Sequence, residues 1–425
     1  MGIGSSTVYL YGAMIYLFTQ VVDAPIRYAL QISGLELLLY ARDLIPITIV
    51  GSILVCAIVI GKINKLMLIV LLLLAMYILV GMLHVANALQ VAFGIKLLLP
   101  LLMGIICYPH FFANPKKTRM ILGAYLVIAC IGVYANYFIT FPWQGLNYNI
   151  GGIEIEGTLE RETIGFNRIV GFSRANFEVA TQIMLLAVFM ISFSKKKTMS
   201  IIIWVAVGAA IFLTTTKAAI GTYLLISLFL LAYKCVPNIF QIYQKMLIIP
   251  LCLMIALPLY LTNENMMIDL SDPVQVGLFA SFGDRVLNAW PPIFEYVHDN
   301  ANPITGMGIG SVGAAEQHMG DEYHGPTDNM FVFLYAWFGV LSVIGLAITY
   351  LRCQRLEIER NNIDFCFFLW VTIIMCNGIT SDIIESPFFS FILGMTLKHL
   401  YTFSSKTTHR QNVIAATKSC LYDNN

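Results

Sequence analysis

Long apolar runs, separated by short polar connectors, make up most of the chain. A helix needs about 20 apolar residues to cross the hydrocarbon core of a membrane, which is about 30 Å thick. The runs do not alternate between apolar and polar positions as barrel strands do, and helices satisfy their own backbone groups inside lipid. The pattern predicts about twelve transmembrane helices, at residues 8–22, 44–60, 66–83, 89–111, 119–140, 179–194, 199–214, 218–233, 246–262, 329–350, 365–380 and 387–403.

Two of the connectors are long, at about 141–178 and 263–328. In the second connector, apolar residues recur every three or four positions between Phe279 and Val297, a spacing that predicts a helix face. The proline pair at 291–292 interrupts this face. We therefore expect two short helices along the membrane surface, the second starting at the prolines.

The rest of the chain predicts one domain with a tail. Residues 28–40 predict an amphipathic helix in the membrane interface. The polar end, residues 405–425, predicts a flexible tail. We expect residues 1–404 to form a single all-α transmembrane domain.

Composition supports a polytopic membrane protein. The chain is 58% hydrophobic and 12% charged, with a mean hydropathy of +0.78, whereas soluble domains carry roughly 25% charged residues. The net charge of +1 indicates no particular partner, and we expect no nucleic acid. The N-terminus, "MGIGSSTVYLYGAMIYLF", lacks the basic start and the small-residue cleavage site of a secretory signal, so we expect no cleaved signal.

The nine cysteines predict neither disulfides nor a metal site. Six of them fall in apolar runs and three in basic connectors or the tail, and none lies in a long polar loop. Disulfide frameworks and metal sites group cysteines in polar or extracellular segments. We expect no metal and no cofactor.

Basic residues predict the orientation. Of the 25 lysines and arginines, 17 lie on alternate connectors or at the C-terminal end, for example at 195–197 and 352–360. Connectors rich in lysine and arginine stay in the cytoplasm. We therefore expect both termini to be cytoplasmic, and the two long connectors to face outward.

The outward side then holds 20 of the 24 acids but only eight basic residues. These eight are Arg27, Arg42, Lys96, Arg161, Arg168, Arg174, Lys217 and Arg285. Two explanations compete. Each cation can pair with one of the many acids, which we prefer for Arg27, Arg42 and Arg161. Alternatively a cation can hold an anionic ligand, since the arginine fork matches phosphate and lysine acts as a point charge.

Four of these cations favour a ligand site. Arg168 and Arg174 lie just before a predicted helix, Lys217 lies in a very short turn between two helices, and Arg285 lies on the predicted surface helix. Three separate elements thus bring cations to one level of the membrane. A lysine that reaches from the helix end to the interface explains Lys217 equally well.

The glycine-rich stretch "GMGIGSVG" contains the pattern GxGxxG at Gly308, Gly310 and Gly313. A dinucleotide site needs a preceding strand and a following helix in a βαβ unit, which the sequence does not predict. The glycines more simply predict a tight loop whose backbone approaches a ligand or another helix.

The polar residues that follow the glycines include two candidate bases. We expect Glu316, His318 and Asp321 to be solvated loop residues. His324 and Asp328 lie closest to the next helix and could take a proton. A neutral histidine is a competent base, whereas an aspartate needs desolvation to raise its pKa. Asp328 could equally be the N-cap of that helix. We favour Asp328 narrowly, because the helix start fixes its position.

Over about residues 120–400, these segments resemble the O-antigen polymerase and O-antigen ligase superfamily of bacterial inner-membrane proteins. The resemblance lies in "RIVGFSRANFEVA", "TTTKAAIG", "DRVLNAW", "NPITGMGIGSVG" and "DNMFVFLYAWFGVLSVIG". Where the family often has an arginine in the Thr-rich turn, this chain has Lys217. Where ligases have His-Asn, it has Asp328-Asn329, which favours a polymerase. No outward arginine has a glycine eleven residues later, as some polymerases do.

The resemblance implies a metal-independent glycosyltransferase of lipopolysaccharide or other surface polysaccharide synthesis. Its substrates would be oligosaccharides linked to undecaprenyl diphosphate, transferred en bloc at the outer face of the inner membrane. It implies diphosphate binding by Arg168, Arg174, Lys217 and Arg285, and proton transfer by Asp328 or His324. Membrane lipids, a chain-length regulator and a flippase would be its partners. The alternatives are a ligase, a transporter or flippase of lipid-linked oligosaccharide, and a non-catalytic polysaccharide-binding protein.

Overall fold

The computed structural model describes residues 3–60, 65–85, 87–145, 147–150, 153–156, 162–163, 166–232, 236, 238–262, 281–320, 322–358 and 362–402. Its helices up to α9 are α1 (Ile3–Val21), α2 (Asp23–Ile32), the 3-10 helix η1 (Glu36–Asp43), α3 (Leu44–Ile60), α4 (Lys65–Val85), α5 (Ala88–Ala113), α6 (Pro115–Phe138), α7 (Asn176–Ser192), α8 (Lys197–Leu213) and α9 (Lys217–Ala232). Those that follow are α10 (Ile239–Met246), α11 (Ile248–Leu261), the π-helix η2 (Arg285–Ala289), α13 (Trp290–Asn300), α14 (Ala314–Met319), α15 (Met330–Phe338), α16 (Leu341–Cys353), α17 (Asn362–Gly378) and α18 (Pro387–Thr402).

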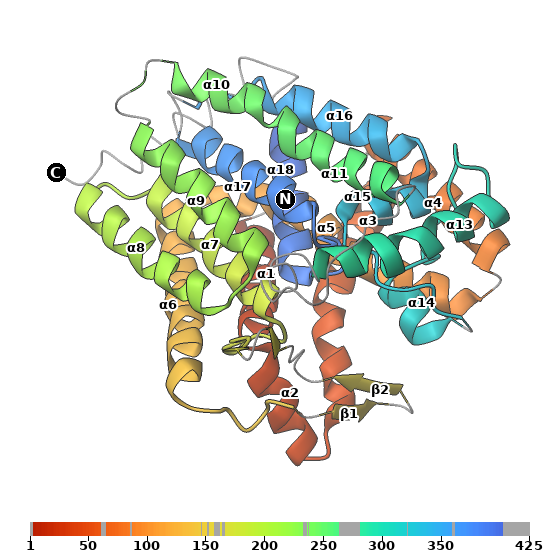
Figure 1. Ribbon diagram of the computed structural model, residues 1–425, viewed down its shortest axis with the longest axis horizontal. Helices are drawn as coiled ribbons and strands as arrows, with labels where there is room; N and C mark the ends of the chain where they lie inside the picture. The colour runs from red at the N-terminus through yellow and green to blue at the C-terminus, as the bar shows by residue number, and fades with distance from the viewer. Residues whose placement is uncertain are drawn as a thin grey trace.

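Four short strands form two antiparallel pairs between α6 and α7. They are β1 (Asn147–Ile150) with β2 (Ile153–Glu156), and β3 (Glu162–Thr163) with β4 (Phe166–Asn167). In Figure 1 the pair β1–β2 is drawn at the same edge of the view as α2, away from the mass of helices. The architecture is otherwise helical.

Five helical segments in the described part of the chain are long and apolar enough to cross a membrane. They are Glu36–Ala57, Leu68–Val85, Ala88–Ala113, Pro115–Phe138 and Ile239–Leu261, and five further apolar helices are shorter. Two sequence expectations need correction. The run 329–350 forms two helices, α15 and α16, because the chain turns at Gly339 with φ of 57°. Residues 28–40 span the end of α2 and most of η1, with a turn at Gly34 between them.

The centre of the bundle is formed by α5, α7, α17 and α18. Helices α5 and α18 approach closely because each presents a glycine to the other's backbone. A Cβ on Gly104 would lie 2.1 Å from the Phe391 carbonyl oxygen, and one on Gly394 would lie 2.0 Å from that of Leu101. Small residues permit such close helix packing in membranes. Helix α17 is joined to α7 by the Trp370 indole, which donates to the Leu185 carbonyl at 3.0 Å.

Hydrogen bonds gather the basic connectors at one end of the bundle. The Arg119 Nη1 donates to the Phe193 carbonyl at 2.6 Å, which joins the α5–α6 and α7–α8 connectors. The Gln244 Nε2 donates to the Leu356 carbonyl at 3.0 Å, which joins α10 to the α16–α17 connector. We call this the basic end.

The alternate connectors meet at the opposite end, which we call the acidic end. The Gln90 Nε2 donates to the Gly310 carbonyl at 2.8 Å, and the Asn176 Nδ2 donates to the Thr214 carbonyl at 3.2 Å. The Ala24 N–H donates to the Phe172 carbonyl at 3.1 Å. The long loops before α7 and before α15 therefore lie at the same end.

The surface helix before α15 is continuous rather than divided. A helical turn at 281–284 runs into η2, and α13 follows with the prolines in its first turn. The expected division into two helices is therefore wrong, although the prolines do fall in the first turn of α13, where a missing N–H costs least. The π turn accommodates the two residues that cannot donate. The predicted face is buried at Val286, Trp290, Ile293 and Val297, whereas Phe279 lies outside the described residues.

Candidate functional site

The glycine loop packs against helices rather than around a nucleotide. Gly308 and Gly310 have φ of 87° and 91°, in the left-handed region that favours glycine. A Cβ on Gly308 would lie 2.1 Å from the backbone nitrogen of Gly81 in α4, and one on Gly310 would lie 2.8 Å from the Gln90 carbonyl oxygen in α5. The glycines are therefore needed for close contact between the loop and two helices.

Three of the predicted cations come together at the acidic end. Arg168 precedes α7, Lys217 is the first residue of α9, and Arg285 is the first residue of η2. The pKa of Lys217 is lowered by burial and then by the charges of Arg168 and Arg285. We call these three residues the cation group. Three separate elements bring these like charges near one another, an arrangement suited to an anionic ligand.

A cavity of about 490 Å³ opens beside Arg168. Its polar wall includes Asn136, Gln144 and Thr215, and its apolar wall includes Tyr137, Phe138, Ile139, Phe212 and Leu213. Tyr137 and Phe138 are 60% and 79% exposed, so the apolar wall continues onto the outer surface of the bundle. The cavity therefore joins one member of the cation group, Arg168, to an apolar surface.

Asp328 is held beside the cation group and does not cap the helix. Its Oδ2 accepts from the Arg285 Nε at 3.1 Å, and Arg285 also donates to Ser281. The capping role belongs to Asn329, whose side chain accepts from the N–H groups of Phe331 and Val332. Asp328 precedes the cap with φ of 41°. Its carboxylate is thus positioned by Arg285.

His324 is held by a different set of contacts. Its Nδ1 lies 2.6 Å from the Glu316 Oε1, and its ring stacks on Tyr296 at 3.8 Å between centroids. The expectation of a solvated side chain is wrong for Glu316, because α14 packs against α5, whereas His318 is partly exposed. Glu316 is 2% exposed, and burial raises its pKa despite the partner histidine. His318 contacts the Phe93 ring, and burial, followed by the charge of Arg174, lowers its pKa. Asp321 lies outside the described residues.

Arg174 differs from the other cations. Its Nε is buried and has no hydrogen-bond partner among the described residues. Burial lowers its pKa, and the charge of Arg27 lowers it further, against the opposing charges of Glu178 and Asp23. A guanidinium with a buried donor left unpaired retains capacity for an anion.

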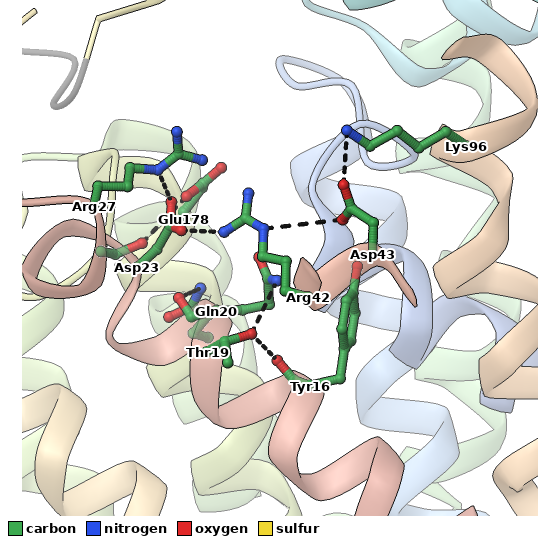
Figure 2. Close-up of polar contacts among 11 residues, drawn as sticks. Tyr16, Thr19, Gln20, Asp23, Arg27, Arg42, Asp43, Lys96 and Glu178 are labelled. Atoms are coloured by element: carbon green, nitrogen blue, oxygen red, sulfur yellow. Dashed lines mark hydrogen bonds and ion pairs between the residues drawn. The ribbon is translucent and has the colours of Figure 1, made fainter. Parts of the chain in front are cut away.

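Asp23 and Arg27, whose charges act on Arg174, belong to a network of ion pairs (Figure 2). Asp23 accepts from the Arg27 Nε at 2.7 Å and also pairs with Arg42. Arg42 reaches Asp43, which pairs with Lys96 at 2.8 Å. Burial alone would raise the pKa of Asp23, but the two arginines lower it to about 2. The preference for ion pairing by Arg27 and Arg42 is confirmed, whereas Arg161 lies outside the described residues.

Two acids that no sequence motif singled out lie in the loop between α17 and α18. Glu385 accepts a hydrogen bond from the Ala314 N–H through its Oε1, and Asp382 accepts one from the Ile384 N–H at 2.9 Å. The Asp382 Oδ2 is buried and unpaired among the described residues. The available signal was "SDIIES", which places two acids in one short connector at the acidic end.

The two loop acids lie close enough to act on each other, and the charge of Asp328 acts on both. Burial raises the pKa of Glu385 to about 7, and the charge of Asp328 adds to this while Arg174 opposes it. Burial, then the charge of Glu385, raises the pKa of Asp382 well above its usual value. We call Asp328, Asp382 and Glu385 the carboxylate group. It is linked electrostatically to the cation group through the Arg285–Asp328 pair and, on its other side, to Arg174.

Comparison with protein-family models, with curated proteins and with solved structures finds no match. Among the described residues, no group of three or more His, Cys, Asp and Glu side chains is arranged to hold a metal ion. What the described residues do assemble is a set of cations beside a partly apolar cavity, with carboxylates next to them. Such a set can bind a phosphate and can accept a proton.

Proposed function

We propose that this protein is a membrane glycosyltransferase that polymerises oligosaccharide units linked to undecaprenyl diphosphate into a surface polysaccharide. The observation that carries the proposal is the cation group beside the cavity of about 490 Å³. A lipid diphosphate has two anionic phosphates and an apolar chain. The cation group suits the phosphates, and the cavity wall around Tyr137 and Phe138 suits the beginning of the chain.

The chemistry needs cations at this place. When the bond between sugar and diphosphate breaks, the leaving group gains negative charge, and cations already in position stabilise that charge without reorganisation. The long loops at the acidic end hold the donor and the acceptor glycan close together, which makes the reaction effectively intramolecular. Asp328, fixed by Arg285, lies beside the leaving group.

In this proposal the chain crosses the inner membrane about twelve times, and several of the shorter apolar helices are spans as well. The basic end faces the cytoplasm, since lysines and arginines are retained there, so both termini are cytoplasmic. A cysteine at position 300 should then react with an impermeant reagent from outside, whereas one at position 196 should not. Reaction of position 196 alone would invert the protein and remove the site from the side where the glycan is.

Deletion of the gene, followed by analysis of the surface glycan by length, tests the function. We expect single repeat units in place of long chains. Long chains retained on the lipid carrier would instead indicate a ligase, and units trapped on the cytoplasmic side a flippase. A normal length distribution would overturn the proposal. The polymerase is favoured over the ligase because the residue before Asn329 is an aspartate paired with an arginine.

A further inference from the structure

The two candidate bases closest to α15, Asp328 and His324, are both held by other side chains. Asp328 accepts from Arg285, so a proton on its carboxylate would weaken an ion pair at the leaving-group site. His324 is held between the Glu316 carboxylate and the Tyr296 ring. No contact among the described residues joins His324 to Asp328. A proton acceptor in the same charge group, but without a cation bound to it, would be better placed.

Glu385 has that position. Its Oε1 is fixed by the Ala314 N–H, directly after the glycine loop. The loop can come this close because Gly313 has no side chain: a Cβ there would lie 2.2 Å from the same oxygen. The other carboxylate oxygen, Oε2, accepts no hydrogen bond from the residues that the structure describes. The carboxylate is therefore oriented by one oxygen and free to react at the other.

Three charged residues act on Glu385 and its neighbour in the loop. Arg174 precedes α7, Asp328 precedes α15, and Asp382 lies in the same loop as Glu385. Burial and mutual repulsion raise the pKa values of the two neighbouring carboxylates Asp382 and Glu385, so the pair does not ionise fully near neutral pH. Arg174 limits this effect at Glu385. The site can therefore take up and release a proton close to pH 7.

We propose that Glu385 accepts the proton of the acceptor hydroxyl during glycosyl transfer, an inference that rests on the function proposed above. The acceptor oxygen forms a bond to the anomeric carbon, and the bond from that carbon to the diphosphate oxygen breaks. Its electron pair leaves with undecaprenyl diphosphate, which the cation group holds. The hydroxyl proton moves to Glu385, which returns it to water before the next cycle.

The test compares Glu385→Gln with Glu295→Gln in cells that lack the chromosomal copy. Glutamine keeps an acceptor for the Ala314 N–H but cannot take a proton, and Glu295 is an exposed glutamate of α13 at the same end. General bases contribute roughly 10²–10⁴-fold. We expect Glu385→Gln to lower polymer per molecule of protein at least 100-fold, and Glu385→Asp to retain part of the activity. Glu295→Gln should make normal chains.

Binding separates this inference from the function on which it rests. Purified protein in nanodiscs is titrated with undecaprenyl diphosphate. Glu385→Gln should bind this lipid as the wild type does, since Glu385 is not one of its cations. Normal chains from Glu385→Gln would overturn the role of Glu385 and leave the function standing. Normal chains after gene deletion, or no binding by the wild type, would overturn the function itself.

The pH profile of the wild type decides the matter if Glu385→Gln fails to accumulate. A base must be deprotonated, so activity should be full above the pKa of Glu385, about 7, and should fall as pH drops through it. The groups facing Glu385 are Asp382, Asp328, Arg174 and the Ala314 N–H. Chain extension in spheroplasts at pH 5.5 to 8 gives the profile. A flat profile over this range would contradict the proposal.

Discussion

Two polar groups at opposite ends of the molecule differ in how completely they are paired. At the basic end, the Tyr108 hydroxyl lies 2.8 Å from the His399 Nδ1, and the His399 Nε2 lies 3.1 Å from the Asp364 Oδ1. The second oxygen of Asp364 accepts from the Glu357 N–H. This triad joins α5, α17 and α18, and both His399 and Asp364 are almost fully buried.

At the acidic end, the pairing is incomplete. The Arg174 Nε and the Asp382 Oδ2 are buried without partners in the described part of the chain, although the ion pairs around Asp23 are complete next to them. Buried polar atoms are normally paired, because an unpaired one costs roughly 1–3 kcal/mol. A complete group stabilises the fold, whereas an incomplete one keeps its binding capacity for a ligand. Four predictions test this difference.

The largest effect should come from breaking the complete triad. Asp364→Ala leaves His399 and the Glu357 N–H without their acceptor in the interior, and each buried donor left unpaired costs about 1–3 kcal/mol. We expect less protein in the membrane and a lower unfolding temperature in detergent. His399→Gln, which keeps one donor, should be milder. Normal stability of Asp364→Ala would show that this triad does not hold the helices together.

Arginine-to-alanine changes at the acidic end should lower activity and leave the amount of protein unchanged. Arg174→Ala, and likewise Arg168→Ala and Arg285→Ala, should lose contacts to a buried anion worth about 2–5 kcal/mol, which is tenfold or more in rate. Protein amount should stay near normal, and Arg174→Ala should even relieve repulsion from Arg27. Polymer length and protein level, measured in the same cells, check this. Loss of protein in parallel with loss of polymer would make Arg174 a structural residue.

The sequence predicted the positions of the helices better than it predicted the contacts at the acidic end. The apolar runs located the helices because burial in lipid requires continuous apolar segments. The break between α15 and α16 at Gly339 could not be predicted, because it depends on contact with a loop distant in sequence. A Cβ on Gly339 would lie 2.5 Å from the Pro303 carbonyl oxygen. The same holds for Glu385. Nothing in its own connector shows that Gly313 and Ala314 will lie against its carboxylate.

Asp328 and Asn329 show that the sequence also could not predict the role of a single residue at the start of α15. Both residue types cap helices well, so the sequence left the role of Asp328 open. The structure assigns the cap to Asn329, because Arg285 draws the Asp328 side chain in another direction. The capping preference of the residue types thus predicted where the helix starts. A contact between residues 43 positions apart in sequence determines which of the two residues is the cap.

The third prediction concerns the glycine that lets the loop approach Glu385. Gly313→Ala places a methyl group against the Glu385 Oε1 and forces alanine into φ of 80°. It should displace the carboxylate and lower polymerisation about tenfold, which corresponds to about 1.4 kcal/mol. Gly345→Ala, in α16 with open space around it, is the matched control and should be neutral or slightly stabilising. Equal activity of the two variants would show that the position of the glycine loop does not affect glycosyl transfer.

The smallest effects should come from the two bases that the sequence favoured. Asp328→Asn keeps an acceptor for the Arg285 Nε but loses the charge, so Arg285 should hold the diphosphate less precisely. We expect a severalfold loss of polymer, and no loss of helix stability, because Asn329 keeps the cap. His324→Ala should leave Glu316 buried without its partner, which affects protein level more than chain length. Chain-length analysis and protein level for both variants give the answer. Complete loss of polymer in Asp328→Asn at normal protein level, with activity kept in Glu385→Gln, would transfer the role of the base from Glu385 to Asp328.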